Sequence, residues 1–225
     1  MTRRWSTAAL FAIAFSIAGL VALAIAFGGT STYRSIMREY SPATFHVSGP
    51  TGPRVDHVPL DALTDWHNGW FAYVTGDAER PPVSFGARMF TASEYAHMAD
   101  VRNVFVGARI AAAIAAAVAG VLLAMAWRRD PRAALVLARD GTAAAAVGMA
   151  VVGALAAVAF DPLFLLFHEI LFPQGNFLFG PDSNLIAMYP DEYWSGVVFR
   201  VGIAFVAATA IIAVGATATL RRARR

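Results

Sequence analysis

Four long stretches of this 225-residue sequence contain no charged residue. They cover residues 5–33, 110–127, 141–160 and 201–220. A bilayer core about 30 Å thick requires roughly 20 apolar residues in a helix to cross it. The second stretch is the shortest, but it can extend past Arg109, whose long side chain can reach the interface. The sequence therefore predicts an all-α polytopic membrane protein with four transmembrane helices.

The composition agrees with this prediction. Only 15% of the residues are charged, against about 25% in typical soluble domains. The first apolar run is longer than the core of a signal peptide and lacks a clear A-x-A cleavage site, so we expect a retained helix. Because the chain has no cysteine, disulfides, a cysteine nucleophile and a cysteine metal site are excluded.

The arginines predict the orientation of the helices. The chain has no lysine, and ten of its 18 basic residues precede the first helix, separate the second from the third, or follow the fourth. Such residues favour the cytoplasmic side. We therefore expect both termini and the loop 128–140 in the cytoplasm, in an N-in/C-in arrangement. The pI of about 9.7 then reflects topology and requires no nucleic-acid partner.

Seven segments follow from these boundaries. We expect a first transmembrane helix, an extracytoplasmic cap, a second helix with an outer extension, a cytoplasmic loop, a third helix, an outer loop, and a fourth helix with a basic tail. In the same order, they cover residues 1–28, 29–91, 92–127, 128–140, 141–168, 169–193 and 194–225.

Local patterns refine two of these segments. In the cap, residues 44–47 and 83–85 have the composition of short strands, and residues 59–74 have apolar positions at helical spacing. A small α+β cap is therefore expected. Thr91 and Glu94 have capping-box spacing, which predicts a helix start near residue 92. Pro162 is expected to kink the third helix.

Two histidines have suggestive neighbours. His97 lies three residues from both Glu94 and Asp100, so the three side chains share one face of a helix. Flanking carboxylates can orient an imidazole and make it more basic, although a surface helix of mixed charge gives the same spacing. His168 follows Asp161 by seven residues, two helical turns, and the alternative is an interfacial histidine that reaches water.

Asp161 itself leaves two interpretations open. An ionisable group within a membrane segment suggests function, but a structural ion pair with Arg109 or Arg200 is equally consistent with the sequence. In the outer loop, Gln174 and Asn176 can donate hydrogen bonds to an oxyanion or cap turns. His97, Asp100, His168 and Glu169 could jointly bind a metal, but their spacing matches no strong zinc motif, so neither a metal nor a cofactor is predicted.

Two long motifs carry a family resemblance. They are SEYAHMADVR, at residues 93–102, and FDPLFLLFHEILFPQGNFLFGPDSNLIAMYPDEYW, at residues 160–194. Both resemble motifs of the bacterial family of four-helix integral membrane proteins that includes the lipoprotein intramolecular transacylase. Phe177 departs from the family pattern, which usually has Trp there, and Pro162 is also unexpected.

The resemblance implies an activity at the outer face of the bacterial plasma membrane. The enzyme would move the sn-2 acyl chain of a diacylglyceryl-modified N-terminal cysteine of a lipoprotein to the α-amine of that cysteine. Its partners would be that N-terminus and membrane lipid, without a cofactor.

The family's two essential histidines fall on His97 and His168. We expect His168 to act as the base on the amine and His97 to assist the oxygen, although the reverse order is equally possible. The supporting residues would orient the imidazoles, stabilise the oxyanion or line the site, and they are Glu94, Asp100, Arg102, Asp161, Glu169 and Asn176.

Two other classes of protein remain open. A non-catalytic accessory or binding protein would use the cap to hold a partner or a lipid. A metal-dependent membrane hydrolase would use the same histidines and carboxylates as ligands.

Overall fold

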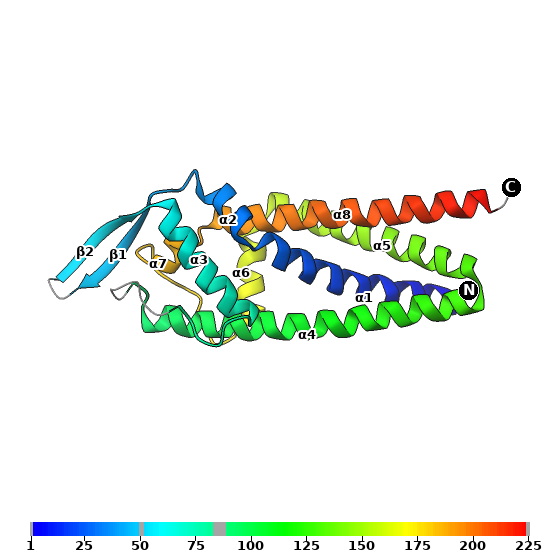
Figure 1. The fold of residues 1–225 in the computed structure, drawn as a ribbon, viewed down its shortest axis with the longest axis horizontal. Helices are drawn as coiled ribbons and strands as arrows, with labels where there is room; N and C mark the ends of the chain where they lie inside the picture. Colours follow the sequence, from blue (N-terminus) through cyan, green and yellow to red (C-terminus); the bar gives the residue numbers. More distant parts are fainter. Residues whose placement is uncertain (1, 50–51, 83–88, 224–225) are drawn as a thin grey trace. The chain divides into compact units, whose positions relative to one another are not determined.

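The computed structural model describes residues 2–49, 52–82 and 89–223. The helices and strands follow one another along the chain as shown in Figure 1. In order, they are α1 (Thr2–Phe27), α2 (Thr30–Met37), β1 (Ala43–Gly49), β2 (Gly52–Val58), α3 (Leu60–Thr75), α4 (Ala92–Arg129), α5 (Pro131–Val158), α6 (Phe160–Leu171), α7 (Asn184–Met188) and α8 (Asp191–Arg222).

The chain divides into two compact units. Unit 1 consists of Met1–Ala24, Ala108–Ala159 and Phe199–Arg225. Unit 2 consists of Ile25–Gly107 and Phe160–Val198. Unit 1 therefore holds most of the four long helices, and unit 2 holds the hairpin, the short helices and the first turns of α4 and α8.

The four long helices of the described chain, α1, α4, α5 and α8, are each long and apolar enough to cross a membrane. The predicted four-helix multi-pass membrane protein is confirmed. Large apolar side chains such as Ile110, Val147 and Ile203 are exposed, as expected for helices whose outer faces contact lipid. A helix suits this environment because it satisfies its own backbone hydrogen bonds.

Small residues and phenylalanines form the core of unit 1. The rings of Phe11 and Phe15 on α1 stack with centroids 5.9 Å apart. Around Phe11, buried Ala115 of α4 and Leu137 of α5 complete one cluster. Phe205 of α8 lies in a second cluster with residues of α1 and α5. Small side chains let the backbones approach closely, as is usual between membrane helices.

The expected cytoplasmic loop 128–140 is mostly helical. Only Asp130 separates α4 from α5. The Asp130 carboxylate accepts a hydrogen bond of 2.9 Å from the backbone N–H of Arg132, and Pro131 occupies the start of α5. An Asp N-cap followed by proline favours a helix start, so this turn begins α5 about ten residues earlier than the prediction.

The single helix expected over residues 141–168 is two helices. Ala159 interrupts it with φ −146° and ψ 45°. In a continuous helix, the ring of Pro162 would clash with the carbonyl of Val158, four residues earlier. As a first-turn residue of α6, Pro162 has no such clash, so the chain breaks where only a kink was expected.

In unit 2, the segment between α1 and α4 contains helices and a hairpin. β1 and β2 pair antiparallel, from Ala43 opposite Val58 to Gly49 opposite Gly52. The strand predicted at 44–47 is confirmed, and the strand expected at 83–85 lies outside the described residues. The helices α2 and α7 were not predicted.

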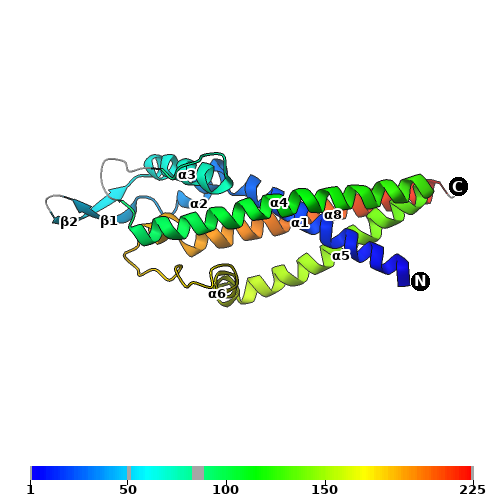
Figure 2. The ribbon, with the colours of Figure 1, turned by 90° about the horizontal axis from the view of Figure 1, so that it is seen from below.

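The predicted amphipathic helix over residues 59–74 is α3. Its apolar face buries Leu63, Trp66 and Trp70. Gly76 ends the helix in a left-handed conformation with φ 86°, which glycine adopts at little cost. Within unit 2, α3 runs obliquely to α4 and reaches it near the C-terminal end of α3 (Figure 1), and Figure 2 shows the same two helices from below.

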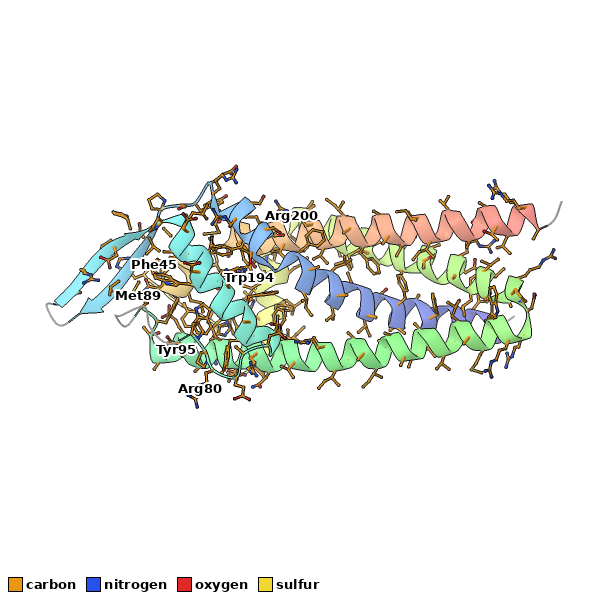
Figure 3. The ribbon with its side chains drawn as sticks, viewed as in Figure 1. Phe45, Arg80, Met89, Tyr95, Trp194 and Arg200 are labelled. Atoms are coloured by element: carbon orange, nitrogen blue, oxygen red, sulfur yellow. The ribbon has the colours of Figure 1, made fainter. Side chains whose placement is uncertain are left out.

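An aromatic cluster joins these elements of unit 2. The ring centroid of Phe90 lies 5.3 Å from that of Trp70, 6.3 Å from that of Phe45 and 6.1 Å from that of Tyr95. Figure 3 labels Phe45 on β1 and Tyr95 on α4, the two ends of this cluster. The cluster therefore packs the hairpin and α3 against the beginning of α4.

The packing of α1 against α5 makes a testable prediction. A Cβ atom at Gly141 would overlap the buried ring of Phe11, whereas one at Gly148 would meet nothing within 4 Å. We expect Gly141→Leu to lower the free energy of unfolding by about 1–3 kcal/mol, typical of overpacking. In detergent, this should appear as a lower Tm. The matched control Gly148→Leu, also on α5, should leave the Tm unchanged; an equal loss in both variants would contradict this packing.

Candidate functional site

The structure brings His97 and His168 together in unit 2. His97 lies on α4 and His168 on α6, and their ring centroids are 6.3 Å apart with an interplanar angle of 21°. His97 is only 7% exposed, and His168 is half-buried. Among the described residues, this is the only pair of histidines in which one member comes from the motif at residues 93–102 and the other from the motif at residues 160–194.

Phenylalanines surround the two imidazoles. Phe172 contacts both, with its ring centroid 4.9 Å from that of His97 and 5.6 Å from that of His168. The other rings lie between 4.4 and 5.5 Å from one of the two imidazoles, and they belong to Phe164, Phe167, Phe177 and Phe179. This phenylalanine cage shields much of the two imidazoles, although His168 stays half-buried, and it offers an apolar wall that suits an acyl chain.

A backbone hydrogen bond sets the tautomer of His168. Its Nδ1 lies 2.8 Å from the carbonyl oxygen of Phe164. A carbonyl can only accept a hydrogen bond, so Nδ1 carries the proton. In the neutral imidazole, Nε2 then has the free lone pair. His168 is therefore oriented to take up a proton at Nε2.

Beside this imidazole, two buried polar atoms form no hydrogen bond of normal geometry among the described residues, although their side chains interact with each other. They are Nδ1 of His97 and Oδ1 of Asn176. A buried polar atom without a partner is costly and therefore uncommon. Such atoms at one site are suited to bind polar groups of a substrate, such as an amine or a hydroxyl.

Asp100 holds the loop that follows α6. Its Oδ2 accepts hydrogen bonds of 2.8 Å from Gln174 Nε2 and 2.6 Å from Asn176 Nδ2. The sequence predicted Asp100 and Asn176 as site residues, and the structure places them in direct contact. The carboxylate on α4 thus fixes the segment that carries Phe177 and Phe179 next to the histidines.

Glu94 is buried and accepts four hydrogen bonds. Two come from the backbone N–H and hydroxyl of Thr91, at 2.6 and 2.9 Å, and Thr91 accepts in return from the N–H of Glu94. The predicted capping box is confirmed. The other two come from the hydroxyl of Ser183 at 2.5 Å and the N–H of Leu185 at 3.0 Å. Glu94 therefore joins the start of α4 to α7, a role that the sequence did not indicate.

Arg102, a residue of α4, contacts the C-terminal end of α3. Its guanidinium donates hydrogen bonds to the carbonyls of Tyr73 and Ala78 and stacks over the Tyr73 ring at 4.8 Å. These contacts hold the C-terminal end of α3 on α4. Both hydrogen bonds come from Nη1, and the oxyanion role expected from the sequence stays a prediction.

Asp161 and Glu169 are exposed on α6. In the described part of the chain, no hydrogen bond or ion pair joins either carboxylate to the imidazoles, and their supporting roles stay predictions. No group of three His, Asp or Glu side chains that could hold a metal occurs among the described residues.

A third histidine, His67, is buried in a separate part of unit 2. It stacks on Tyr33 with ring centroids 4.1 Å apart, and its Nδ1 lies 3.2 Å from the hydroxyl of Tyr189. Tyr193 packs edge-on against it. Burial lowers the pKa of His67 from 6.5 to about 4, because these rings remove the hydration of the charged form. This histidine belongs to the core.

Comparisons with known proteins identify relatives. A family model described as "Lipoprotein intramolecular transacylase Lit" matches residues 6–194. The in meso structure of the membrane integral lipoprotein intramolecular transacylase Lit from Bacillus cereus is similar with a TM-score of 0.74 and 13% identity, over 99% of this chain and 98% of that chain. No curated protein sequence matches significantly.

Two variants of the Bacillus cereus protein are also similar. One carries a histidine-to-alanine mutation and matches with a TM-score of 0.72 and 13% identity, over 99% of this chain and 96% of that chain. The other carries a histidine-to-arginine mutation and matches with a TM-score of 0.67 and 16% identity, over 96% and 91%. At these identities, the structures establish a shared fold.

His67 predicts a pH dependence of stability. Since its pKa is lower in the folded chain, the unfolded chain binds more protons between pH 6.5 and about 4, so stability falls as the pH decreases through this window. We expect the wild type to lose about 3 kcal/mol more than His67→Phe over that range, measured by unfolding in detergent. His57→Phe, at an exposed position of β2, should keep the wild-type dependence. Identical pH profiles for the wild type and His67→Phe would refute this explanation.

Proposed function

Because the chain belongs to the family of lipoprotein intramolecular transacylases, we propose that it moves the sn-2 acyl chain of a diacylglyceryl-modified N-terminal cysteine to the α-amine of the same cysteine. The product is a lyso-form lipoprotein with one chain on nitrogen and one on the glycerol. The stacked pair of His97 and His168, 6.3 Å apart inside the phenylalanine cage, carries the proposal for this chain.

The reaction needs one base and one acid. The amine nitrogen attacks the ester carbonyl carbon, a C–N bond forms, and the C–O bond to the glycerol breaks. The nitrogen loses a proton and the glycerol oxygen gains one, so no other reactant is consumed. An α-amine with a pKa of about 7.7–8 requires only a mild base, and histidine suits both proton transfers.

We assign His168 as the base. Its Nδ1 proton is held by the Phe164 carbonyl, which leaves Nε2 free to accept the amine proton. His97 then acts as the acid and donates a proton to the leaving glycerol oxygen. The proton taken up by His168 afterwards passes to His97, so both imidazoles return to their starting states. Nδ1 of His97 and Oδ1 of Asn176 are the groups available for the polar atoms of the substrate.

The remaining site residues position the reactants. Asp100 fixes Asn176 through the 2.6 Å hydrogen bond that it accepts from Nδ2, so Oδ1 of Asn176 is left to accept a hydrogen bond from the attacking amine. Glu94 holds the same loop from its other end through Ser183. In an intramolecular transfer, this positioning provides much of the rate enhancement.

We propose that this site faces the outside of the bacterial plasma membrane. The arginines at both chain ends and at the turn between α4 and α5 favour a cytoplasmic location for these parts. Unit 2 would then include the extracytoplasmic cap, residues 29–91, and the outer loop, residues 169–193. Diacylglyceryl-modified N-termini anchored in the outer leaflet would reach the histidines there.

Substitution of either histidine should remove activity. We expect His97→Ala and His168→Ala each to lower kcat by at least about 100-fold, as is typical for loss of an acid or base. The assay is conversion of a diacyl lipopeptide by the purified protein, followed by mass spectrometry. His57→Ala, on an exposed site of β2, is the matched control and should convert substrate at the wild-type rate. Wild-type rates in both site variants would exclude the proposed chemistry.

The orientation can be tested with single cysteines, since the chain has none of its own. We expect Val55→Cys on β2 to react with a membrane-impermeant maleimide in intact spheroplasts. Arg129→Cys, at the end of α4, should react only after permeabilisation. The reverse pattern would place the hairpin in the cytoplasm and contradict the proposed outer site.

A further inference from the structure

A cavity of unit 2 lies next to the histidine pair. Its volume of about 300 Å³ is at the lower end of the range for ligand pockets. The start of α4 forms one wall with Thr91 and Ser93, and the loop before α7 forms another with Phe179 and Asp182. The hairpin contributes His46.

Phe179 connects this cavity with His97. The residue lines the cavity, and its ring centroid lies 5.5 Å from that of His97. Ser93 and His97 are four residues apart on α4, so about 6 Å of helix rise separates them. A substrate held at His97 therefore needs to extend only a short distance to reach Ser93.

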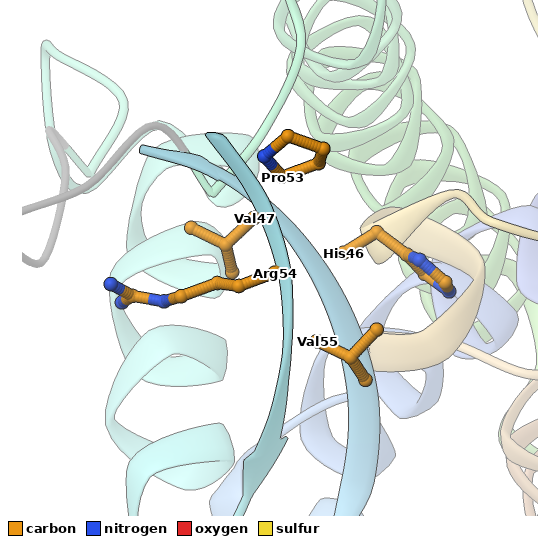
Figure 4. Close-up of a pocket in the computed structure, with 5 residues that line it drawn as sticks. All are labelled: His46, Val47, Pro53, Arg54 and Val55. Atoms are coloured by element: carbon orange, nitrogen blue, oxygen red, sulfur yellow. The ribbon is translucent and has the colours of Figure 1, made fainter. Parts of the chain in front are cut away.

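The cavity lining combines two apolar side chains, Met89 and Phe179, with hydroxyls, an imidazole and carboxylates. His46 Nε2 lies 3.4 Å from Asp182 Oδ1, and the Asp182 side chain is 81% exposed. Ser93 and Thr91 add hydroxyls, which are 3.0 Å apart. Figure 4, a close-up of another pocket on the hairpin, shows the His46 side chain on one side of the hairpin and Val47 and Arg54 on the other, so the imidazole is directed away from them.

This chemistry favours one class of occupant. An acyl chain in this cavity would take water away from the hydroxyls and carboxylates of the wall without replacing its hydrogen bonds, which is costly. A lipid phosphate is repelled by the Asp182 and Glu94 carboxylates, and none of the described lining residues is an arginine. A peptide backbone presents N–H groups, which carboxylate and hydroxyl oxygens accept.

We propose that this cavity binds the peptide segment that follows the lipid-modified cysteine, an inference that rests on the proposed function. An extended chain advances about 3.3–3.6 Å per residue, so the second residue after the cysteine reaches the level of Ser93. The phenylalanine cage takes the lipid and the cavity takes the peptide, with His97 between them. Asp182 and Ser93 thereby contribute to recognition of a lipoprotein in preference to a simple lipid.

Crosslinking in the cysteine-free chain tests this placement. A diacyl lipopeptide with a chloroacetamide side chain at the second residue after its cysteine is mixed with purified full-length Ser93→Cys protein. We expect the thiolate to displace chloride at least tenfold faster than in Ala92→Cys, an exposed neighbour on α4 that does not line the cavity. Intact-protein mass spectrometry reports the adduct. Equal rates in the two variants would overturn the proposal, whether or not the protein turns over substrate.

Kinetics provide a second test that separates this inference from the proposed function. We expect the wild type to convert a lipopeptide with several residues at least tenfold more efficiently, in kcat/KM, than the diacylglyceryl-cysteine amide alone. Ser93→Trp should reduce this ratio to about one, whereas Ala92→Trp should keep it. A Ser93→Trp protein with the wild-type ratio would overturn the peptide site. If the wild type converts neither substrate, the proposed function fails, and the crosslinking result alone decides whether the cavity binds peptide.

Discussion

The buried carboxylate of Glu94 joins the segments on which the site is built. It completes the capping box that starts α4, and it also accepts hydrogen bonds from Ser183 and Leu185 at the start of α7. Removing one side of such a buried network leaves polar groups without partners, which is costly. The loop between α6 and α7 is therefore held at one end by Glu94 and near its other end by Asp100. Both anchors flank His97 on the same helix.

This loop gives the site its two surfaces. Phe172, Phe177 and Phe179 enclose the imidazoles on one side, and Asp182 and Ser183 line the polar cavity on the other. A lipoprotein N-terminus has the same division, because its acyl chains are apolar and its peptide is polar. The arrangement around His97 thus corresponds to the chemical junction at which the proposed acyl transfer takes place.

Features with a local cause could be predicted from the sequence. The spans follow from uncharged length, α3 from apolar spacing, and the start of α4 from Thr91 and Glu94. Two boundaries were missed although their signals are local. Asp130 before Pro131 is an N-cap signal, but the surrounding charges suggested a loop. Pro162 was expected to bend a helix that in fact stops before it.

Long-range contacts could not be predicted from one sequence. The hydrogen bond from Ser183 to Glu94 joins residues 89 positions apart, and no spacing rule indicates it. Arg102 likewise binds the carbonyls of Tyr73 and Ala78 at the end of α3, contacts that its position in the sequence did not indicate. Asp161 was expected from helical spacing to point the same way as His168, and its side chain is exposed on α6. The density of phenylalanines after His168 was the available signal for the cage.

The central claim is that acyl transfer takes place within one substrate molecule. The most direct test uses a diacyl lipopeptide with an isotopically labelled sn-2 chain, mixed with an equal amount of unlabelled lipopeptide that differs in peptide mass. After incubation with the purified protein, fragment masses locate the label. The account predicts labelled N-acyl cysteine only on the peptide that began with the label, together with a mono-acylglyceryl thioether. Label released as free fatty acid, transferred to the other peptide, or left on the glycerol would contradict it.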